Sequence, residues 1–228
     1  MVARGDLGVE MSPEKVPSIQ KEIIHRANER LKIVVTATQM LDSMIEHPRP
    51  TRAEASDVAN AIFDGSDALM LSGETAVGKY PIGAVKSLGH ISRTTEVFLE
   101  KLNETRPRIE VCSELAAKAA LARSIAHMID EMNVEMVVAC IQTADIASLL
   151  GKARIDVPIL ALCPDRKTAQ QISLNYGVLS VCQREQLSPF QRWVGQVDQL
   201  VLDNGWAKKG DKLLLMPPVS VLAGNTSA

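Results

Sequence analysis

The sequence carries little excess charge of either sign and lacks a long apolar run. Its 228 residues hold 25 Lys and Arg against 27 Asp and Glu, a formal net charge of -2. Surfaces that bind nucleic acid or anionic membranes are typically strongly positive, so neither partner is expected. No apolar run approaches the ~20 residues that cross a bilayer. No basic segment leads into an apolar stretch at the start, as a secretory signal would.

Paired cysteines and clustered histidines are also missing. The four cysteines, Cys112, Cys140, Cys163 and Cys182, are widely spaced, and no two of them form a C-x-x-C pair. Three of them lie in or at the end of apolar runs, where reduced, buried thiols usually occur. The four histidines are spread along the chain. This pattern favours a cytoplasmic protein without a disulfide framework or a cysteine–histidine metal site.

What the sequence does have is a regular alternation of strand-like and helix-like segments. A helical pattern begins after Ser12, the expected N-cap, and Pro13; a second begins with the capping box expected from Thr51 and Glu54 and stops at Gly65. A third runs from about 81 to 102. Apolar runs at 33–40 and 67–75 lie between them. Fully apolar strands joined by helices are typical of parallel strands buried on both faces.

A polar, aperiodic segment, ETRPRIE at 104–110, divides the chain. We therefore predict two domains, 1–103 and 104–228. In the second, apolar strands are expected at 136–141, 158–163, 177–182 and 212–217, each preceded by a helix. That order predicts an α/β domain with three layers and a mostly parallel sheet.

Each predicted strand of the first domain ends in small or reactive residues. Gly5 and Asp6 follow the first in a charged turn, Thr38 follows the second, and Ser72 and Glu74 follow the third. The carboxyl ends of parallel strands are where α/β proteins build their sites. A glycine before an acidic residue lets backbone N–H groups approach an anion, and a carboxylate is a hard ligand suited to Mg²⁺.

Other interpretations of these residues stay open. Thr38 also fits the N-cap of a helix. Ser72 has no nearby histidine to activate it as a nucleophile, and Glu74 can equally be structural. Arg4 is expected to be an ion-pair partner, and Arg52 an exposed residue in the first turn of a helix.

The stretches MVARGDLGVE and VVTATQMLDSMIEHPRPTRAEASDVANAIFDGSDALMLSGETAVGKYP, in this order, resemble pyruvate kinase. The resemblance implies that the first domain is the last three βα units of a (β/α)8 TIM barrel, and that 104–228 is the C-terminal α/β domain of that family. It further implies that the chain is a fragment, without the first five units and the inserted lid domain.

The resemblance also assigns roles. It implies that the N–H groups of Gly5 and Asp6 and the hydroxyl of Thr38 hold the substrate carboxylate, and that Asp6 binds Mg²⁺ or Mn²⁺. Thr38 would also face the enolate carbon, and Ser72 would lie near the path of proton delivery. The K⁺ ligands, a lysine, an arginine and a second metal-binding glutamate would lie upstream of residue 1.

The expected activity is phosphoryl transfer from phosphoenolpyruvate to ADP, giving pyruvate and ATP, in an intact enzyme that is a homotetramer. The chain alone is expected to be inactive. An alternative is a non-catalytic chain that assembles with full-length subunits as a regulatory module. A different Mg²⁺-dependent barrel that acts on pyruvate is a third hypothesis, which the second domain argues against.

Overall fold

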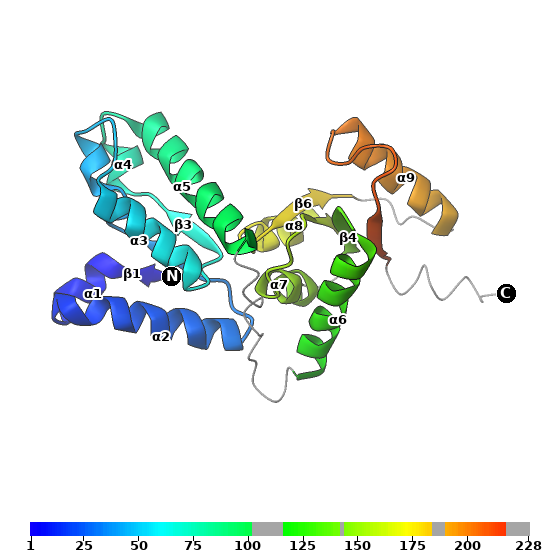
Figure 1. The fold of residues 1–228 in the computed structure, drawn as a ribbon, viewed down its shortest axis with the longest axis horizontal. Coiled ribbons are helices and arrows are strands. Elements are labelled where there is room, and N and C mark those ends of the chain that lie inside the picture. The colour runs from blue at the N-terminus through cyan, green and yellow to red at the C-terminus, as the bar shows by residue number, and fades with distance from the viewer. Residues whose placement is uncertain (102–115, 142–143, 184–189, 218–228) are drawn as a thin grey trace. The chain divides into compact units, whose positions relative to one another are not determined.

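The chain divides into two units. The computed structural model describes residues 1–101, 116–141, 144–183 and 190–217, and the backbone contacts separate Met1–Cys112 from Ser113–Ala228 (Figure 1). Each unit is described by itself. The predicted boundary at 103/104 and Cys112 lie outside the described residues, so the boundary remains a prediction.

The first unit is built on three short parallel strands. They are β1 (Val2–Ala3), β2 (Val35–Ala37) and β3 (Ala68–Met70), in the order β1-β2-β3. Val2 pairs with Thr36, and Val35 pairs with Ala68. The parallel arrangement confirms the prediction, but β2 is shorter than the apolar run at 33–40. It ends at Ala37 because Thr38 and Gln39 adopt left-handed backbone, with φ of +69° and +52°, outside the region of extended strands.

Helices follow each of these strands. They are α1 (Arg4–Glu10), the 3₁₀ turn η1 (Pro13–Lys15), α2 (Val16–Glu29), the 3₁₀ turn η2 (Asp42–Ile45), α3 (Arg52–Phe63), α4 (Gly73–Ala76) and α5 (Pro81–Lys101). Two local predictions were wrong. Residues 4–6 begin the helix α1 rather than forming a turn, and Ser12, although it stands at the N-cap of η1, makes no side-chain capping bond.

The predicted capping box at the start of α3 is confirmed. Thr51 Oγ1 accepts a hydrogen bond from the Glu54 N–H at 3.2 Å, and Glu54 accepts one from the Thr51 N–H at 2.7 Å. The N–H and hydroxyl of Ser43 also donate to Glu54. Burial alone raises the pKa of Glu54, but the hydrogen bonds from Ser43 and Thr51 outweigh it and lower the pKa. The ionised carboxylate therefore joins η2 to α3. Gly65, with φ of +97°, ends this segment as predicted.

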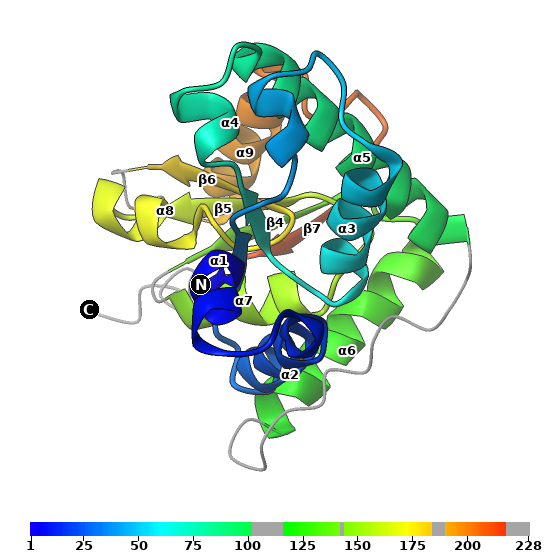
Figure 2. The ribbon, with the colours of Figure 1, turned by 90° about the vertical axis from the view of Figure 1, so that its left-hand side faces the viewer.

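Apolar side chains on the helices cover the short sheet. Figure 2 shows helices of this unit, with α2 in blue, α3 in cyan and α5 in green. One cluster joins the segment after β2 to α3 and α5; its buried members are Met40, Leu41, Met44, Val58, Ala61, Ile62 and Ala84. A second joins β1 to α2; its buried members are Val2, Ile24 and Val34. Burial of this apolar area stabilises the unit by about 25 cal/mol per Å² removed from water.

A buried carboxylate ties together the segments that follow β2 and β3. Glu74 is only 2% exposed. Its Oε1 accepts a hydrogen bond from the Leu41 N–H at 2.9 Å, and its Oε2 accepts one from the Ser72 N–H at 2.8 Å. Both backbone groups need an acceptor, since a buried donor without a partner costs about 1–3 kcal/mol. Glu74 therefore has a structural role, one of the two that its sequence context allowed.

The second unit is a four-stranded, fully parallel sheet. Its strands are β4 (Met136–Cys140), β5 (Ile159–Cys163), β6 (Val178–Cys182) and β7 (Leu213–Met216), in the order β6-β5-β4-β7. Its helices are α6 (Ala116–Met132), α7 (Ala144–Lys152), α8 (Arg166–Ile172) and α9 (Phe190–Asp203). All four predicted strands are present within a residue or two of the expected bounds.

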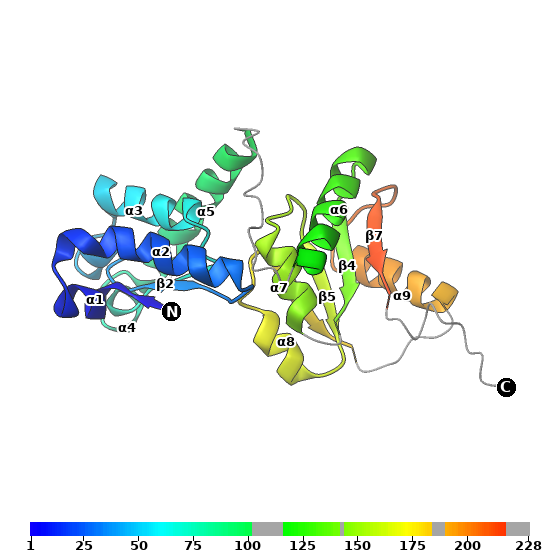
Figure 3. The same ribbon diagram turned by 90° about the horizontal axis from the view of Figure 1, so that it is seen from below.

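Helices on both faces of this sheet give the predicted three layers. One face packs against α9, through contacts of Val138 and Leu160 with Trp193 and Val197. On the other side, α7 and α8 contact β5, and α7 and α9 lie on opposite sides of the sheet (Figure 3). The central strands β4 and β5 are buried along nearly their whole length, as expected of parallel strands covered on both faces, whereas β6 is partly exposed and contains Ser180.

We expect the first unit to open more readily than the second. Its strands span two or three residues, whereas those of the second unit span four or five, so fewer ladder hydrogen bonds protect its amides. Hydrogen exchange followed by mass spectrometry should show faster exchange over 1–101 than over 116–217. Equal protection in the two units would contradict this and would favour completion of the first sheet by partner chains.

Glu74→Gln should destabilise the first unit by about 1–3 kcal/mol. The amide side chain keeps one acceptor, and its NH₂ group faces a backbone N–H that then has no acceptor. Glu46→Gln is the matched control, since Glu46 is an exposed partner of Lys79 and such pairs are worth about 0–1 kcal/mol. Urea unfolding followed at the amides of α3 measures both variants. Equal decreases in the free energy of unfolding of the two variants would show that the hydrogen bonds of Glu74 do not stabilise the first unit.

Candidate functional site

The predicted site residues gather at one edge of the first sheet. Gly5 and Asp6 follow β1 in the first turn of α1, Thr38 follows β2, and Ser72 follows β3. Because the three strands are parallel and neighbours in the order β1-β2-β3, their carboxyl ends lie at the same edge. The topology thus places residues that are up to 67 positions apart in the sequence on one side of the sheet.

Gly5 and Thr38 are in direct contact. The Gly5 N–H donates to Thr38 Oγ1 at 2.8 Å, and the Thr38 hydroxyl donates to the carbonyl of Ala37 at 2.6 Å. A Cβ at Gly5 would lie 3.6 Å from Thr38 Oγ1, directly beside the hydroxyl. The N–H of Gly5 therefore already points at an oxygen acceptor that belongs to the next strand.

Asp6 presents an open carboxylate beside this pair. It is exposed in the first turn of α1, where a negative charge is favoured by the helix dipole. Among the described residues, no group of three or more His, Cys, Asp or Glu side chains is arranged to hold a metal ion. Asp6 is thus a single hard oxygen ligand, which suits Mg²⁺ or Mn²⁺ but supplies only part of a coordination shell.

Ser72 lies at the start of α4 and is half-buried. Its N–H donates to Glu74, and its carbonyl accepts hydrogen bonds from the N–H groups of Thr75 and Ala76. Its hydroxyl does not cap α4. The structure connects Ser72 to the segment after β2 through Glu74, which binds both Ser72 and Leu41.

The structure shows that Thr38 is not a helix N-cap. The next helical turn, η2, begins at Asp42 with Leu41 in the N-cap position. Thr38 instead has a φ of +69°, which is a strained conformation for a β-branched residue. Left-handed backbone costs a non-glycine residue about 1–2 kcal/mol, so contacts elsewhere must hold it in place.

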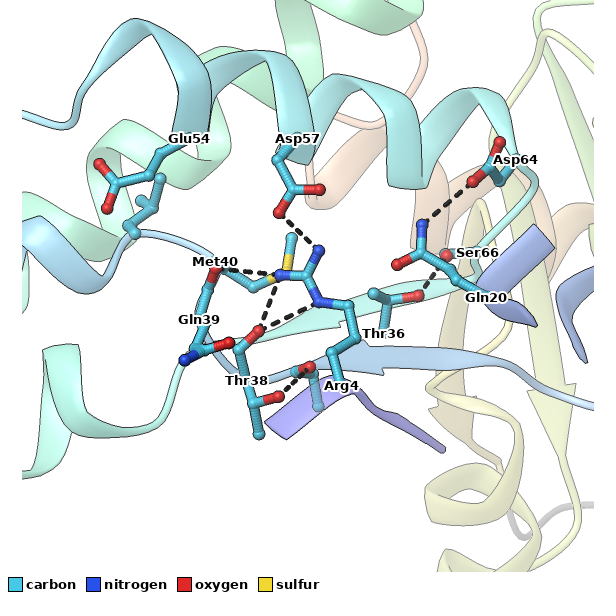
Figure 4. Close-up of polar contacts among 12 residues, drawn as sticks. Arg4, Gln20, Thr36, Thr38, Gln39, Met40, Glu54, Asp57, Asp64 and Ser66 are labelled. Atoms are coloured by element: carbon cyan, nitrogen blue, oxygen red, sulfur yellow. Dashed lines mark hydrogen bonds and ion pairs between the residues drawn. The ribbon is translucent and has the colours of Figure 1, made fainter. Parts of the chain in front are cut away.

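Arg4 makes the predicted ion pair and several further contacts (Figure 4). It is 8% exposed, and its Nη1 lies 2.5 Å from Asp57 Oδ2 in α3. Nε and Nη2 donate to the carbonyl of Thr38 at 3.2 and 2.7 Å, and Nη2 donates to that of Gln39 at 3.0 Å. Only the charge pair could be expected from the residue types, because contacts to backbone carbonyl groups leave no trace in them. Arg52 is exposed in the first turn of α3, as expected.

Two further polar contacts fix the surroundings of β2 (Figure 4). The hydroxyls of Thr36 and Ser66 lie 2.7 Å apart in a buried position. Gln20 in α2 donates to Asp64 at 3.0 Å, and Lys21 also pairs with Asp64. The Thr36–Ser66 contact joins β2 to the segment before β3, and Asp64, at the end of α3, is joined to α2.

The cysteines of the second unit are free thiols. Cys140, Cys163 and Cys182 end three neighbouring strands and form no disulfide. Burial raises the pKa of Cys140 and of Cys163 to about 11, so both stay protonated at neutral pH. Of these three residues, Cys163 is buried, as predicted, Cys140 is half-buried and Cys182 is exposed, so the prediction of a buried thiol is wrong for Cys182.

The described part of the chain contains no helix that is both long enough and apolar enough to cross a membrane.

Two family patterns match the chain, one in each unit. Residues 1–85 match "Pyruvate kinase, barrel domain", and residues 119–227 match "Pyruvate kinase, alpha/beta domain". Among curated proteins, the pyruvate kinase of Bacillus licheniformis is 40% identical over 227 residues, and that of Clostridium perfringens is 45% identical over 186 residues. These matches cover 100% and 79% of this chain, but 38% of each relative.

A solved structure shows the same fold. The crystal structure of a pyruvate kinase from Cryptosporidium parvum superposes with a TM-score of 0.83 at 33% sequence identity, covering 96% of this chain and 44% of that one. The chain thus spans about two fifths of the length of the relatives it matches. Its first unit corresponds to part of their barrel, and its second to their α/β domain, as the sequence predicted. The two family patterns, the identity of about 40% and the shared fold place this chain in the pyruvate kinase family.

Proposed function

We propose that this chain is the carboxyl-terminal part of a pyruvate kinase that transfers a phosphoryl group from phosphoenolpyruvate to ADP, giving pyruvate and ATP. The observation that carries the proposal is the contact between Gly5 and Thr38 at the carboxyl ends of adjacent strands, in a chain of this family. Residues 1–103 then form the last three βα units of the barrel, and 104–228 the C-terminal domain.

Gly5, Asp6 and Thr38 are proposed to hold the substrate carboxylate. Thr38 Oγ1 accepts the Gly5 N–H at 2.8 Å, so an oxygen atom already fits at that distance from the glycine nitrogen. A carboxylate oxygen would replace the hydroxyl as acceptor, and the Thr38 hydroxyl would turn from the Ala37 carbonyl to donate to it. A charged acceptor makes a stronger hydrogen bond than a neutral one, which favours this exchange.

Asp6 is the residue of this chain that would hold the divalent metal. Its carboxylate is exposed at the same edge, and oxygen is the ligand type that Mg²⁺ and Mn²⁺ take. Bound there, the ion would neutralise charge that develops during phosphoryl transfer. The remaining ligands, those for K⁺ and the phosphoryl-binding lysine would come from the first five βα units.

Thr38 and Ser72 are the proposed catalytic hydroxyls for the proton that converts enolpyruvate into pyruvate. Thr38 lies at the carboxylate end of the substrate and would face its enolate carbon. Ser72, fixed by the hydrogen bond of its N–H to Glu74, would lie on the path that delivers the proton. Neither hydroxyl acts as a nucleophile in this scheme. The intact enzyme is proposed to be a cytoplasmic homotetramer.

The proposal is tested by measuring pyruvate formation from phosphoenolpyruvate and ADP. The isolated chain should show no turnover, because charge neutralisation of the transferring group is incomplete without the other half of the barrel. In the full-length kinase that carries this chain, Asp6→Asn should lower kcat by at least about 10²-fold and shift the rate titration to higher Mg²⁺ concentration.

Glu10→Gln is the matched control, since Glu10 is an exposed acid in the same helix. It should leave both the rate and the Mg²⁺ titration unchanged. An Asp6→Asn titration that superposes on that of Glu10→Gln would overturn the ligand assignment. Turnover by the isolated chain would overturn the proposal that half of the site is supplied from elsewhere. The regulatory alternative would be favoured if the isolated chain assembled with full-length subunits and the full-length protein that carries this chain showed no turnover.

A further inference from the structure

Most of the contacts of Arg4 are made to backbone carbonyls rather than to its charge partner. Its guanidinium binds the carbonyls of Thr38 and Gln39 through three N–H···O contacts, and Nη2 also lies 2.8 Å from Met40 Sδ. Only Nη1 serves the ion pair with Asp57, whose side chain is 39% exposed. An ion pair alone would not need a buried guanidinium aimed along three successive residues.

Both residues whose carbonyls Arg4 binds have left-handed backbone. Thr38 and Gln39 have φ of +69° and +52°, and neither is a glycine. Residues held in such conformations persist only where surrounding contacts determine them, and they gather at functional sites. The Gln39 side chain is exposed, so its own packing does not determine its conformation.

We propose that Arg4 is a positioning residue for Thr38. Its guanidinium fork binds both carbonyls only when Thr38 and Gln39 are left-handed, and this conformation turns the Thr38 hydroxyl toward the Gly5 N–H. Asp57 orients the fork from the opposite side by holding Nη1. The value of this arrangement for substrate binding rests on the proposed function, in which Thr38 and Gly5 hold the carboxylate.

For this role, the fixed, planar arrangement of the guanidinium N–H donors matters more than the positive charge. Arginine offers five N–H donors in fixed directions, and here Nε and both Nη atoms are used. A lysine at this position would keep the charge for Asp57 but would present one nitrogen, which cannot reach two carbonyls and a carboxylate with the same geometry. The competing explanation is that burial of Met40 and Leu41, which are both fully buried, fixes the backbone without Arg4.

The test compares Arg4→Lys with Asp57→Asn in the present chain by NMR. One readout is the hydrogen-exchange protection factor of the Gly5 amide, calculated with the intrinsic exchange rate that applies after the substituted residue 4. The other is the chemical shift of the Thr38 methyl group. Arg4→Lys should lower the Gly5 protection by about five- to tenfold, the effect of one lost hydrogen bond, and should shift the Thr38 methyl. Asp57→Asn, which keeps an acceptor for Nη1, should change the protection by less than about twofold.

Rescue by glycine separates positioning from general stability. Glycine adopts positive φ without strain, so Gln39→Gly should restore Gly5 protection in the Arg4→Lys background and change it little in the unsubstituted chain. If the changes in Gly5 protection caused by the two substitutions simply add, Gln39→Gly does not rescue Arg4→Lys. Met40 and Leu41 then set the conformation, and the proposal is wrong. It is also wrong if Asp57→Asn lowers protection as much as Arg4→Lys.

A measurement on the unsubstituted chain covers the case in which Arg4→Lys does not fold. The Arg4 Nε–H, bound to the Thr38 carbonyl, should exchange at least about tenfold more slowly than that of the exposed Arg26. Equal exchange rates would overturn the proposal. None of these readouts uses substrate, so the positioning role can fail while the proposed kinase function stands, and the reverse also holds.

Discussion

The buried guanidinium of Arg4 joins three parts of the first unit. Arg4 follows β1, the carbonyls that it binds follow β2, and Asp57 lies in α3. A buried charge is tolerated only when it is fully paired, so each of these partners is needed. Removing any one leaves charge or polar groups unsatisfied in the interior. The positions of two strand ends and one helix therefore depend on a single side chain.

The buried side chain of Glu74 likewise joins the segments that follow β2 and β3. Glu74 binds backbone N–H groups that follow β2 and β3, so the segment after β2 is held by Arg4 on one side and by Glu74 on the other. Arg4 donates hydrogen bonds to carbonyl groups of this segment, and Glu74 accepts one from an N–H group of the same segment. The short strands supply few hydrogen bonds of their own, and these two side chains compensate at the edge where Gly5, Thr38 and Ser72 lie.

Periodicity and capping signals were enough to predict the element order, the parallel sheets and the start of α3. They predict well because the apolar spacing and the Thr51–Glu54 pair are local properties. The left-handed backbone at Thr38 and Gln39 was not predictable, since neither residue is a glycine and the cause lies about 35 residues away in Arg4. Their positions at strand ends made Gly5, Asp6, Thr38 and Ser72 candidates, and the family resemblance supplied their proposed roles. The structural role of Glu74 could be recognised only from its burial.

In the proposed function, the edge formed by the carboxyl ends of β1 and β2 binds a carboxylate and a divalent cation. Paramagnetic broadening by Mn²⁺, in the presence of pyruvate, measures this directly in the present chain. The amide signals of Gly5, Asp6 and Thr38 should broaden first as Mn²⁺ is added, and pyruvate should increase this selectivity. Broadening spread evenly over exposed acids such as Glu22 and Glu46, with no effect of pyruvate, would contradict the proposal.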